Sequence, residues 1–290
     1  MESQVQHSAQ SCDVRSTLFY AGDIRGRGRF DVVEPDRTNL AFVPADVEIR
    51  DARPIHKSLT LEASGFMFAD HASPAAYSPE LFSENMDHRP IPTGISRQYQ
   101  MDVADFLKEL TGAREVFPQM GGLLARTSVR AKTRSWAGVA NFVHLDYTAR
   151  SAQQFLDWTL EAEQKSLKPY SRYSVFQTWR AVSPGPQDNS LAVCDGSSVP
   201  PEDGVVIDSV IGPEDAAGTF FESRLCKPRS THKWYYLANM EPRDLLVFKG
   251  FDSEMPLAMN AMHTAFDNPL ADDTSPPRQS IEARFFAIFD

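Results

Sequence analysis

Three side chains have the types and the spacing of a metal site. His144 and Asp146 lie two residues apart at the end of the apolar run 139–144, which we predict to be a strand. Because residues i and i+2 of a strand point to the same face, their Cα atoms would be about 6–7 Å apart, and one cation would bridge the side chains. His263 lies at the end of another predicted strand. Two imidazoles and one carboxylate on neighbouring strands form the facial triad that binds Fe(II) and leaves coordination positions open.

The remaining metal-binding residue types favour iron over a structural zinc. The cysteines Cys12, Cys194 and Cys226 are odd in number and have no CxxC spacing, so we expect reduced thiols. A structural zinc prefers four closed ligands, whereas this site offers two imidazoles and a hard carboxylate. The other histidines have no partnered aspartate at strand spacing and are interpreted as surface or hydrogen-bonded structural residues: His7, His56, His71, His88 and His232.

A receptor for an organic anion is predicted downstream of His263. Arg278 and Ser280 point the same way on an extended chain, and a guanidinium with a hydroxyl suits the distal carboxylate of a short dicarboxylic acid such as 2-oxoglutarate. The alternative is an ion pair with a protein carboxylate, and the same Arg-x-Ser spacing recurs at 172–174.

Three other basic residues are candidates for anion binding. Arg284 has the parity of Arg278 on the last predicted strand, and Lys249 is a further possible anchor. Arg180 would hold the 1-carboxylate of 2-oxoglutarate or a substrate anion, although stacking on a neighbouring aromatic ring explains it equally well.

Short strands must position these residues. In the first third, strands are predicted at 17–20, 40–43, 47–49, 59–61 and 65–68, and helical periodicity follows at 99–110 and 149–165. Eight further strands are predicted at 173–182, 190–194, 204–211, 219–225, 233–238, 244–250, 261–266 and 280–289. This order indicates a mainly β fold with flanking helices around a double-stranded β-helix, a jelly-roll or cupin-like core with a mouth for a ligand.

Composition limits the partners. The 290 residues have a formal charge of −10, no apolar run long enough to span a bilayer and no signal-like start, so we expect a cytoplasmic protein that binds neither membranes nor nucleic acid. The 20 prolines are spread along the chain, which favours a single domain over 1–290 with a flexible tail at 1–15. A small-molecule substrate fits this composition, and a monomer and a homodimer are equally compatible with it.

Several short blocks, in one order, resemble a known family. They are HLDYT at 144–148, FQTWR at 176–180, LAVCD at 191–195, HKWYY at 232–236, FKGFDS at 248–253, HTAF at 263–266 and PPRQSIEAR at 276–284. From about residue 47 onwards the chain resembles the fungal hydroxylase/desaturase family, which includes gibberellin desaturase-like and cephem-methoxylase-like proteins.

The resemblance implies a non-haem Fe(II) oxygenase with 2-oxoglutarate as co-substrate and O2 as oxidant. It implies hydroxylation, desaturation or oxidative ring closure of a small molecule in specialised metabolism. Other functions are compatible with the residues alone: a metal-dependent hydrolase or isomerase on the same barrel, an iron oxidase independent of 2-oxoglutarate, and a non-catalytic binding module. The side chains of Trp179, Trp234, Tyr235, Tyr236 and Phe251 either line the cavity or belong to the core.

Overall fold

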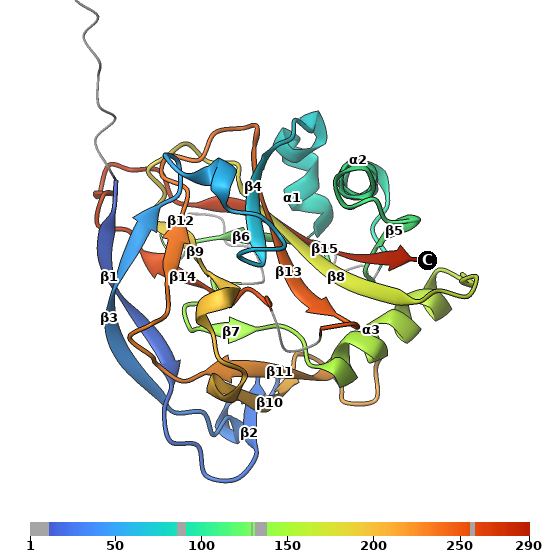
Figure 1. Ribbon diagram of the computed structural model, residues 1–290, viewed down its shortest axis with the longest axis horizontal. Coiled ribbons are helices and arrows are strands. Elements are labelled where there is room, and N and C mark those ends of the chain that lie inside the picture. Colours follow the sequence, from blue (N-terminus) through green and yellow to red (C-terminus); the bar gives the residue numbers. More distant parts are fainter. Residues whose placement is uncertain (1–11, 86–90, 129, 131–137, 256–258) are drawn as a thin grey trace, which may run out of the picture.

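The chain forms two β-sheets with helices packed outside them, as the computed structural model shows in Figure 1. The structure describes residues 12–85, 91–128, 130, 138–255 and 259–290. The sheets contain nine and six strands, and large side chains of both fill the space between them. The predicted jelly-roll-like core, mainly β with flanking helices, is confirmed.

The nine-stranded sheet mixes strands from the whole length of the chain. Its order is β1-β3-β12-β9-β14-β7-β11-β10-β2. The bounds are β1 Val14–Ala21, β2 Gly28–Asp31, β3 Phe42–Asp51, β7 His144–Leu145, β9 Asn189–Cys194, β10 Gly204–Val210, β11 Phe220–Cys226, β12 Trp234–Tyr236 and β14 His263–Asp267.

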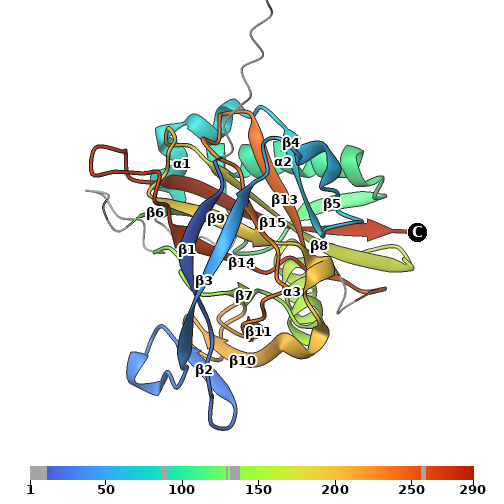
Figure 2. The same cartoon turned by 60° about the vertical axis from the view of Figure 1, so that its left-hand side comes forward.

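The six-stranded sheet is built around the last strand of the chain. Its order is β4-β13-β8-β15-β5, and β6 also pairs with β15. The bounds are β4 Phe66–Asp70, β5 Glu115–Pro118, β6 Leu124–Thr127, β8 Arg172–Ala181, β13 Asp244–Asp252 and β15 Gln279–Phe289. Figure 2 shows β8, β13 and β15 side by side.

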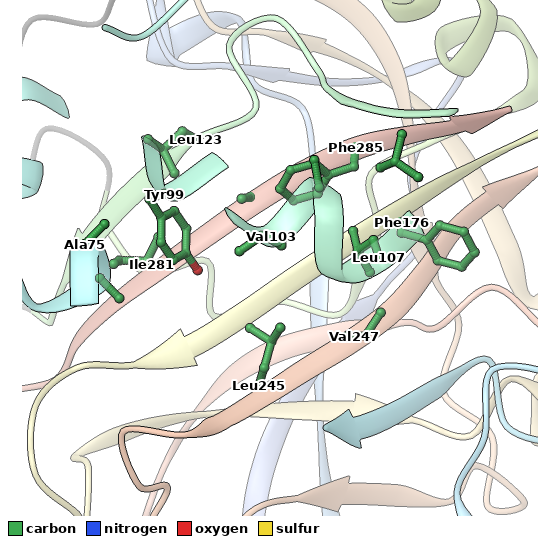
Figure 3. Close-up of a cluster of buried hydrophobic side chains, with 14 of the residues drawn as sticks. Ala75, Tyr99, Val103, Leu107, Leu123, Phe176, Leu245, Val247, Ile281 and Phe285 are labelled. Atoms are coloured by element: carbon green, nitrogen blue, oxygen red, sulfur yellow. The ribbon is translucent and has the colours of Figure 1, made fainter. Parts of the chain in front are cut away.

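Three α-helices lie outside the sheets: α1 Pro79–Asn85, α2 Gly94–Thr111 and α3 Ala149–Ala162. The apolar face of α2 packs on the outer face of the six-stranded sheet, where Val103 and Leu107 meet Phe176 and Phe285 (Figure 3). Helix α3 begins at a capping box in which Thr148 and Ser151 exchange hydrogen bonds. Five short 3₁₀ helices complete the described elements: Pro35–Arg37, His56–Ser58, Pro74–Tyr77, Gly196–Ser198 and Pro201–Asp203.

Alternation along a strand decides which side chains of the six-stranded sheet face the interior. On β8, Phe176 belongs to the cluster under α2, whereas Trp179 packs with side chains of the nine-stranded sheet, such as Tyr235. Gln177 and Trp179 therefore share the inner face, and Arg180 has the opposite parity.

Most predicted elements are confirmed, and the errors lie at short strands. Both helices and all eight later strands occur within a few residues of their predicted bounds, and 40–43 and 47–49 belong to the single strand β3. Residues 59–61 belong to no strand, so the strand predicted there is wrong. The predicted strand 139–144 is also largely wrong, because the regular strand β7 contains only His144 and Leu145, although Ala140 and Val143 form single backbone hydrogen bonds with β14 and β1.

Two further predictions concern the start of the chain and its thiols. Val14 and Arg15 already belong to β1, so the predicted tail 1–15 is wrong at its end, and residues 1–11 lie outside the described part. All three cysteines are free thiols. Within the described residues, none of the helices has the length and hydrophobicity required to span a bilayer.

Candidate metal centre

His144, Asp146 and His263 lie together on the inner face of the nine-stranded sheet. Their potential ligand atoms are all within 4.8 Å of one another. The Nε2 atom of His144 is 3.6 Å from Oδ1 of Asp146, and the rings of His144 and His263 have centroids 4.3 Å apart. This is the donor set of a two-histidine, one-carboxylate facial triad. The side chains of His144 and Asp146 remain 13% and 16% exposed, which leaves the cluster open on one side.

Strand pairing brings the two histidines together although they are far apart in the sequence. His144 on β7 and His263 on β14 are directly paired residues of adjacent antiparallel strands. Directly opposite residues project to the same face. His263 begins its strand instead of ending it, and Asp146 follows β7 directly. The expected convergence of His144 and Asp146 is therefore present, although β7 has only two residues.

Backbone carbonyls orient both imidazole rings. The Nδ1 atom of His144 is 2.8 Å from the carbonyl oxygen of Phe142, and Nδ1 of His263 is 3.3 Å from that of Ala261. A carbonyl can only accept a hydrogen bond, so each Nδ1 holds a ring proton, and Nε2 is the nitrogen that offers a lone pair to a metal in the neutral ring. Burial, together with the nearby His144, lowers the pKa of His263 to about 4, which keeps it neutral at physiological pH.

Asp146 is held in its ionised form. Burial alone would raise the pKa of this carboxyl, but the charge of Arg284 and the two imidazoles lower it overall. The oxygen Oδ2 accepts hydrogen bonds from Gln177 and Arg284, whereas Oδ1 is the oxygen nearest to His144. The site thus presents one ionised carboxylate and two imidazole Nε2 atoms, which are donor types that a divalent metal binds.

Arg278 and Ser280 have the unsatisfied polar atoms that a bound carboxylate would satisfy. Both are buried, with Arg278 only 1% exposed. Arg278 donates to the carbonyl of Asn189, but its Nε atom and the hydroxyl of Ser280 find no partner in the described part of the chain. Burial first, and then the charge of Arg126, lower the pKa of Arg278 to about 9. A buried guanidinium without a paired carboxylate is costly, so these residues fit a dicarboxylate such as 2-oxoglutarate.

The structure does not bring Arg180 or Lys249 to the triad. Arg180 faces the helix layer, where it donates to the carbonyl of His71 and lies over the ring of Tyr99. Lys249 alternates with Phe248, whose ring contacts His263, so Lys249 points to the opposite face, and its Nζ lies 3.6 Å from Asp252. The stacking alternative for Arg180 matches its surroundings.

Arg284 reaches the centre, but through a protein carboxylate. Its Nε and one terminal nitrogen donate to Oδ2 of Asp146 at 3.1 and 2.8 Å, and it forms an ion pair with Glu282.

The role of Gln177 was not identified from the sequence. The available signal was an amide side chain in strand β8, whose residues 173–181 are all buried, since a buried amide requires partners.

The remaining histidines have structural surroundings where the structure describes them. His56 contacts the carbonyl of Arg53, His71 contacts Arg180, and His232 lies 3.1 Å from Asp203. His7 and His88 lie outside the described residues. Among the predicted aromatic residues, Trp179 lines a pocket between the sheets with Ser190, Leu191 and others, whereas Trp234, Tyr235, Tyr236 and Phe251 pack in core clusters.

Comparisons with known proteins agree with this geometry. The family model described as "YDMC: Oxidoreductase/YMDC permease-like domain" matches residues 25–288. The chain is 28% identical over 252 residues to the Fe(II)/2-oxoglutarate-dependent dioxygenase nvfI of Aspergillus novofumigatus, covering 86% of this chain and 84% of that protein. It is 26% identical to the hydroxylase/desaturase efuI of Hormonema carpetanum over 98% of this chain and 97% of the relative.

A solved structure shares the fold over nearly the whole chain. The iron and alpha-ketoglutarate-dependent endoperoxidase NvfI superposes with a TM-score of 0.75 at 25% identity, covering 96% of this chain and 98% of the other. The resemblance to fungal hydroxylase/desaturase proteins is confirmed.

Proposed function

Because this chain belongs to the family of the Oxidoreductase/YMDC permease-like domain, we propose that His144, Asp146 and His263 bind one Fe(II) ion and that Arg278 with Ser280 binds 2-oxoglutarate. The protein is a non-haem Fe(II)- and 2-oxoglutarate-dependent oxygenase of the kind found in fungal secondary metabolism. The observation that carries the residue assignment is a two-histidine, one-carboxylate triad that faces the same space between the sheets as a buried arginine with an unsatisfied Nε.

The chain's own residues hold and shield the reacting groups. When bound, iron and 2-oxoglutarate with O2 supply the oxidant that breaks a substrate C–H bond, and 2-oxoglutarate leaves as succinate and CO2. The carbonyls of Phe142 and Ala261 hold the two imidazole rings in one tautomer. The ring of Phe248 lies 4.9 Å from that of His263 and excludes water from its side of the site.

A small apolar substrate is supported by an aromatic wall beside His144. The ring of Phe142 lies 5.1 Å from His144, and Phe30 and Phe42 lie 5.6 and 5.3 Å from Phe142. Phe42 is 39% exposed, so this wall extends from the surface to the triad. Enzymes of this type act on small molecules.

Several expectations stay predictions of the sequence. They are the single-domain organisation, the cytoplasmic location, the lack of nucleic-acid and membrane partners, and the choice between monomer and homodimer.

The test requires no knowledge of the substrate. Anaerobic protein loaded with Fe(II) is titrated with 2-oxoglutarate, and the visible charge-transfer absorption of the iron chelate is recorded. Slow succinate formation after admission of O2 is then measured. We expect both signals in the wild type and neither in His144→Ala or His263→Ala. Full iron content in these variants would contradict the ligand assignment, and a wild type without any response to 2-oxoglutarate would favour the oxidase, hydrolase or binding-module alternative.

A further inference from the structure

The two oxygens of the Asp146 carboxylate have different surroundings. Oδ1 is the oxygen nearest to His144, at 3.6 Å from its Nε2. Oδ2 accepts three hydrogen bonds: from Nε2 of Gln177 at 2.6 Å, and from a terminal nitrogen and Nε of Arg284 at 2.8 and 3.1 Å. A carboxylate oxygen has two lone pairs, so three N–H donors occupy Oδ2 fully. One oxygen of the ligand is thus directed to the metal site and the other is withheld from it.

The donors come from the opposite sheet. Gln177 on β8 and Arg284 on β15 are directly paired residues of the six-stranded sheet, whereas His144 and His263 belong to the nine-stranded sheet. The orientation of Asp146 therefore depends on how the two sheets face each other. A change in either donor alters the carboxylate without altering either imidazole.

We propose that Arg284 and Gln177 are positioning residues that make Asp146 a single-oxygen ligand. The inference rests on the proposed Fe(II) site. A facial triad leaves one octahedral face open for a chelating co-substrate and O2. A carboxylate that bound through both oxygens would occupy one of these open positions. By occupying Oδ2, the two donors keep that position free.

Arg284 is itself fixed by further charged groups. Glu282, two residues earlier on the same face of β15, forms an ion pair with it, and Nε of Arg126 lies 3.5 Å from the other Glu282 oxygen. Arg126 donates in turn to the carbonyl of Gly138 at 2.6 Å. The charges alternate from Asp146 to Arg126, so each buried charge has an opposite neighbour. The Arg284 guanidinium is thus held at both ends and has its carboxylate partners within the protein.

The ion pairs of Arg284 distinguish its role from that of Arg278. Arg284 already contacts two carboxylates, whereas Arg278 has a buried Nε without a partner in the described chain. The two arginines should therefore affect different ligands: Arg284 the metal, and Arg278 the 2-oxoglutarate. Lysine keeps the charge of arginine but cannot form the two-pronged contact with one oxygen.

The experiment measures metal affinity without 2-oxoglutarate and without turnover. Mn(II) is titrated into metal-free protein and the free ion is followed by electron paramagnetic resonance. We expect Arg284→Lys to weaken Mn(II) binding about 10- to 100-fold, as loss of a group that orients a ligand typically does. Gln177→Leu, which removes one donor without changing the charge, should weaken binding by a smaller factor. The matched control Arg278→Lys should bind Mn(II) within about twofold of the wild type.

The outcomes distinguish this inference from the proposed function. A folded Arg284→Lys protein with wild-type Mn(II) affinity and a raised KM for 2-oxoglutarate would overturn the inference and make Arg284 a co-substrate anchor. If Arg284→Lys does not fold, unchanged Mn(II) affinity in Gln177→Leu would overturn it. A wild-type protein that binds neither Mn(II) nor Fe(II) would overturn the proposed function as well.

Discussion

The guanidinium of Arg278 lies over the ring of Trp179, with its Cζ atom 5.7 Å from the ring centroid. Trp179 is two residues from Gln177 on the inner face of β8, and Gln177 donates to the predicted metal ligand Asp146. Two strand residues span about 7 Å. Trp179 therefore contacts the buried Arg278 cation two residues along β8 from the residue that donates to Asp146.

Replacement of Arg278 should impair use of 2-oxoglutarate specifically. We expect Arg278→Lys or Arg278→Ala to raise the apparent KM for 2-oxoglutarate at least about tenfold, equivalent to roughly 1.4 kcal/mol, because neither residue replaces the two-pronged contact. Ser280→Ala should have a smaller effect, since water can replace one hydroxyl. Succinate formation titrated against 2-oxoglutarate measures both.

Arg180→Lys is the matched control for this prediction. Arg180 is also fully buried and also lies over an aromatic ring, Tyr99, but on the helix side of the sheet. We expect lower stability and an unchanged KM for 2-oxoglutarate. An unchanged KM in Arg278→Ala would instead move the anchor to another basic residue.

A longer carboxylate at position 146 should abolish iron binding. Asp146→Glu adds a methylene, which moves the oxygen by over about 1 Å against a metal-site tolerance of roughly 0.2 Å. It also moves the second oxygen away from Gln177 and Arg284. Iron bound per protein after desalting measures the loss.

Asp252→Glu controls for the general effect of lengthening a buried aspartate. Asp252 is fully buried and accepts two hydrogen bonds from Arg172, at 3.0 and 2.6 Å, on the face of β13 and β8 away from the predicted ligands. We expect reduced stability with normal iron content. Normal iron content in Asp146→Glu would exclude Asp146 as a metal ligand.

The donor set could be predicted from sequence because its signals are local. Alternation along an extended segment places His144 and Asp146 on one face, and this holds even though the regular strand is only two residues long. His263 was the remaining histidine at a predicted strand. Which strands are neighbours was not needed to propose the set.

The surroundings of the donor set depend on register between distant strands, which a single sequence does not contain. Arg284 was predicted as a second anchor because it lies an even number of positions from Arg278. The two side chains do lie on the same face of the sheet. The partner of Arg284, however, is Asp146 of the other sheet. The positions of Arg180 and Lys249 relative to the triad could not be predicted, because they depend on which face of the sheet α2 covers. That face is set only by tertiary packing.

Two glycines in the left-handed region should respond differently to alanine. Gly65 and Gly112 have φ of 79° and 67°. A Cβ at Gly112 has open space, whereas one at Gly65 would overlap the carbonyl oxygen of Met259, four residues before His263. We expect Gly112→Ala to cost about 1 kcal/mol and Gly65→Ala clearly more, because strain and overlap add. Urea unfolding compares them, and equal losses would show that the Met259 segment adjusts freely.

The last prediction concerns His232, a buried histidine outside the metal centre. Its Nε2 is 3.1 Å from Oδ2 of Asp203, and its Nδ1 has no partner among the described residues. Burial lowers the pKa of His232 below its usual 6.5, even though Asp203 favours the charged form. The unfolded chain therefore takes up a proton first as the pH falls. The stability that this histidine contributes is present above about pH 6.5 and is lost as the pH drops toward the folded-state pKa.

The change His232→Gln should flatten that part of the pH dependence. The free energy of unfolding of metal-free protein is measured in urea at pH 7.5 and 5.5 for both proteins. We expect a smaller decrease in the variant, with the difference below the limit of about 1.4 kcal/mol per pH unit that one proton sets. His71 and His263 have pKa values lowered in the same direction, but they are present in both proteins and so cancel in the comparison. The pKa of Asp203 is also lowered, mainly by its hydrogen bond with Arg229. The contribution of Asp203 to the free energy of unfolding is therefore lost only below about pH 4, outside the range between the two measurements. An equal decrease in both proteins would show that His232 titrates alike in the folded and unfolded chains, and burial would then not govern its protonation.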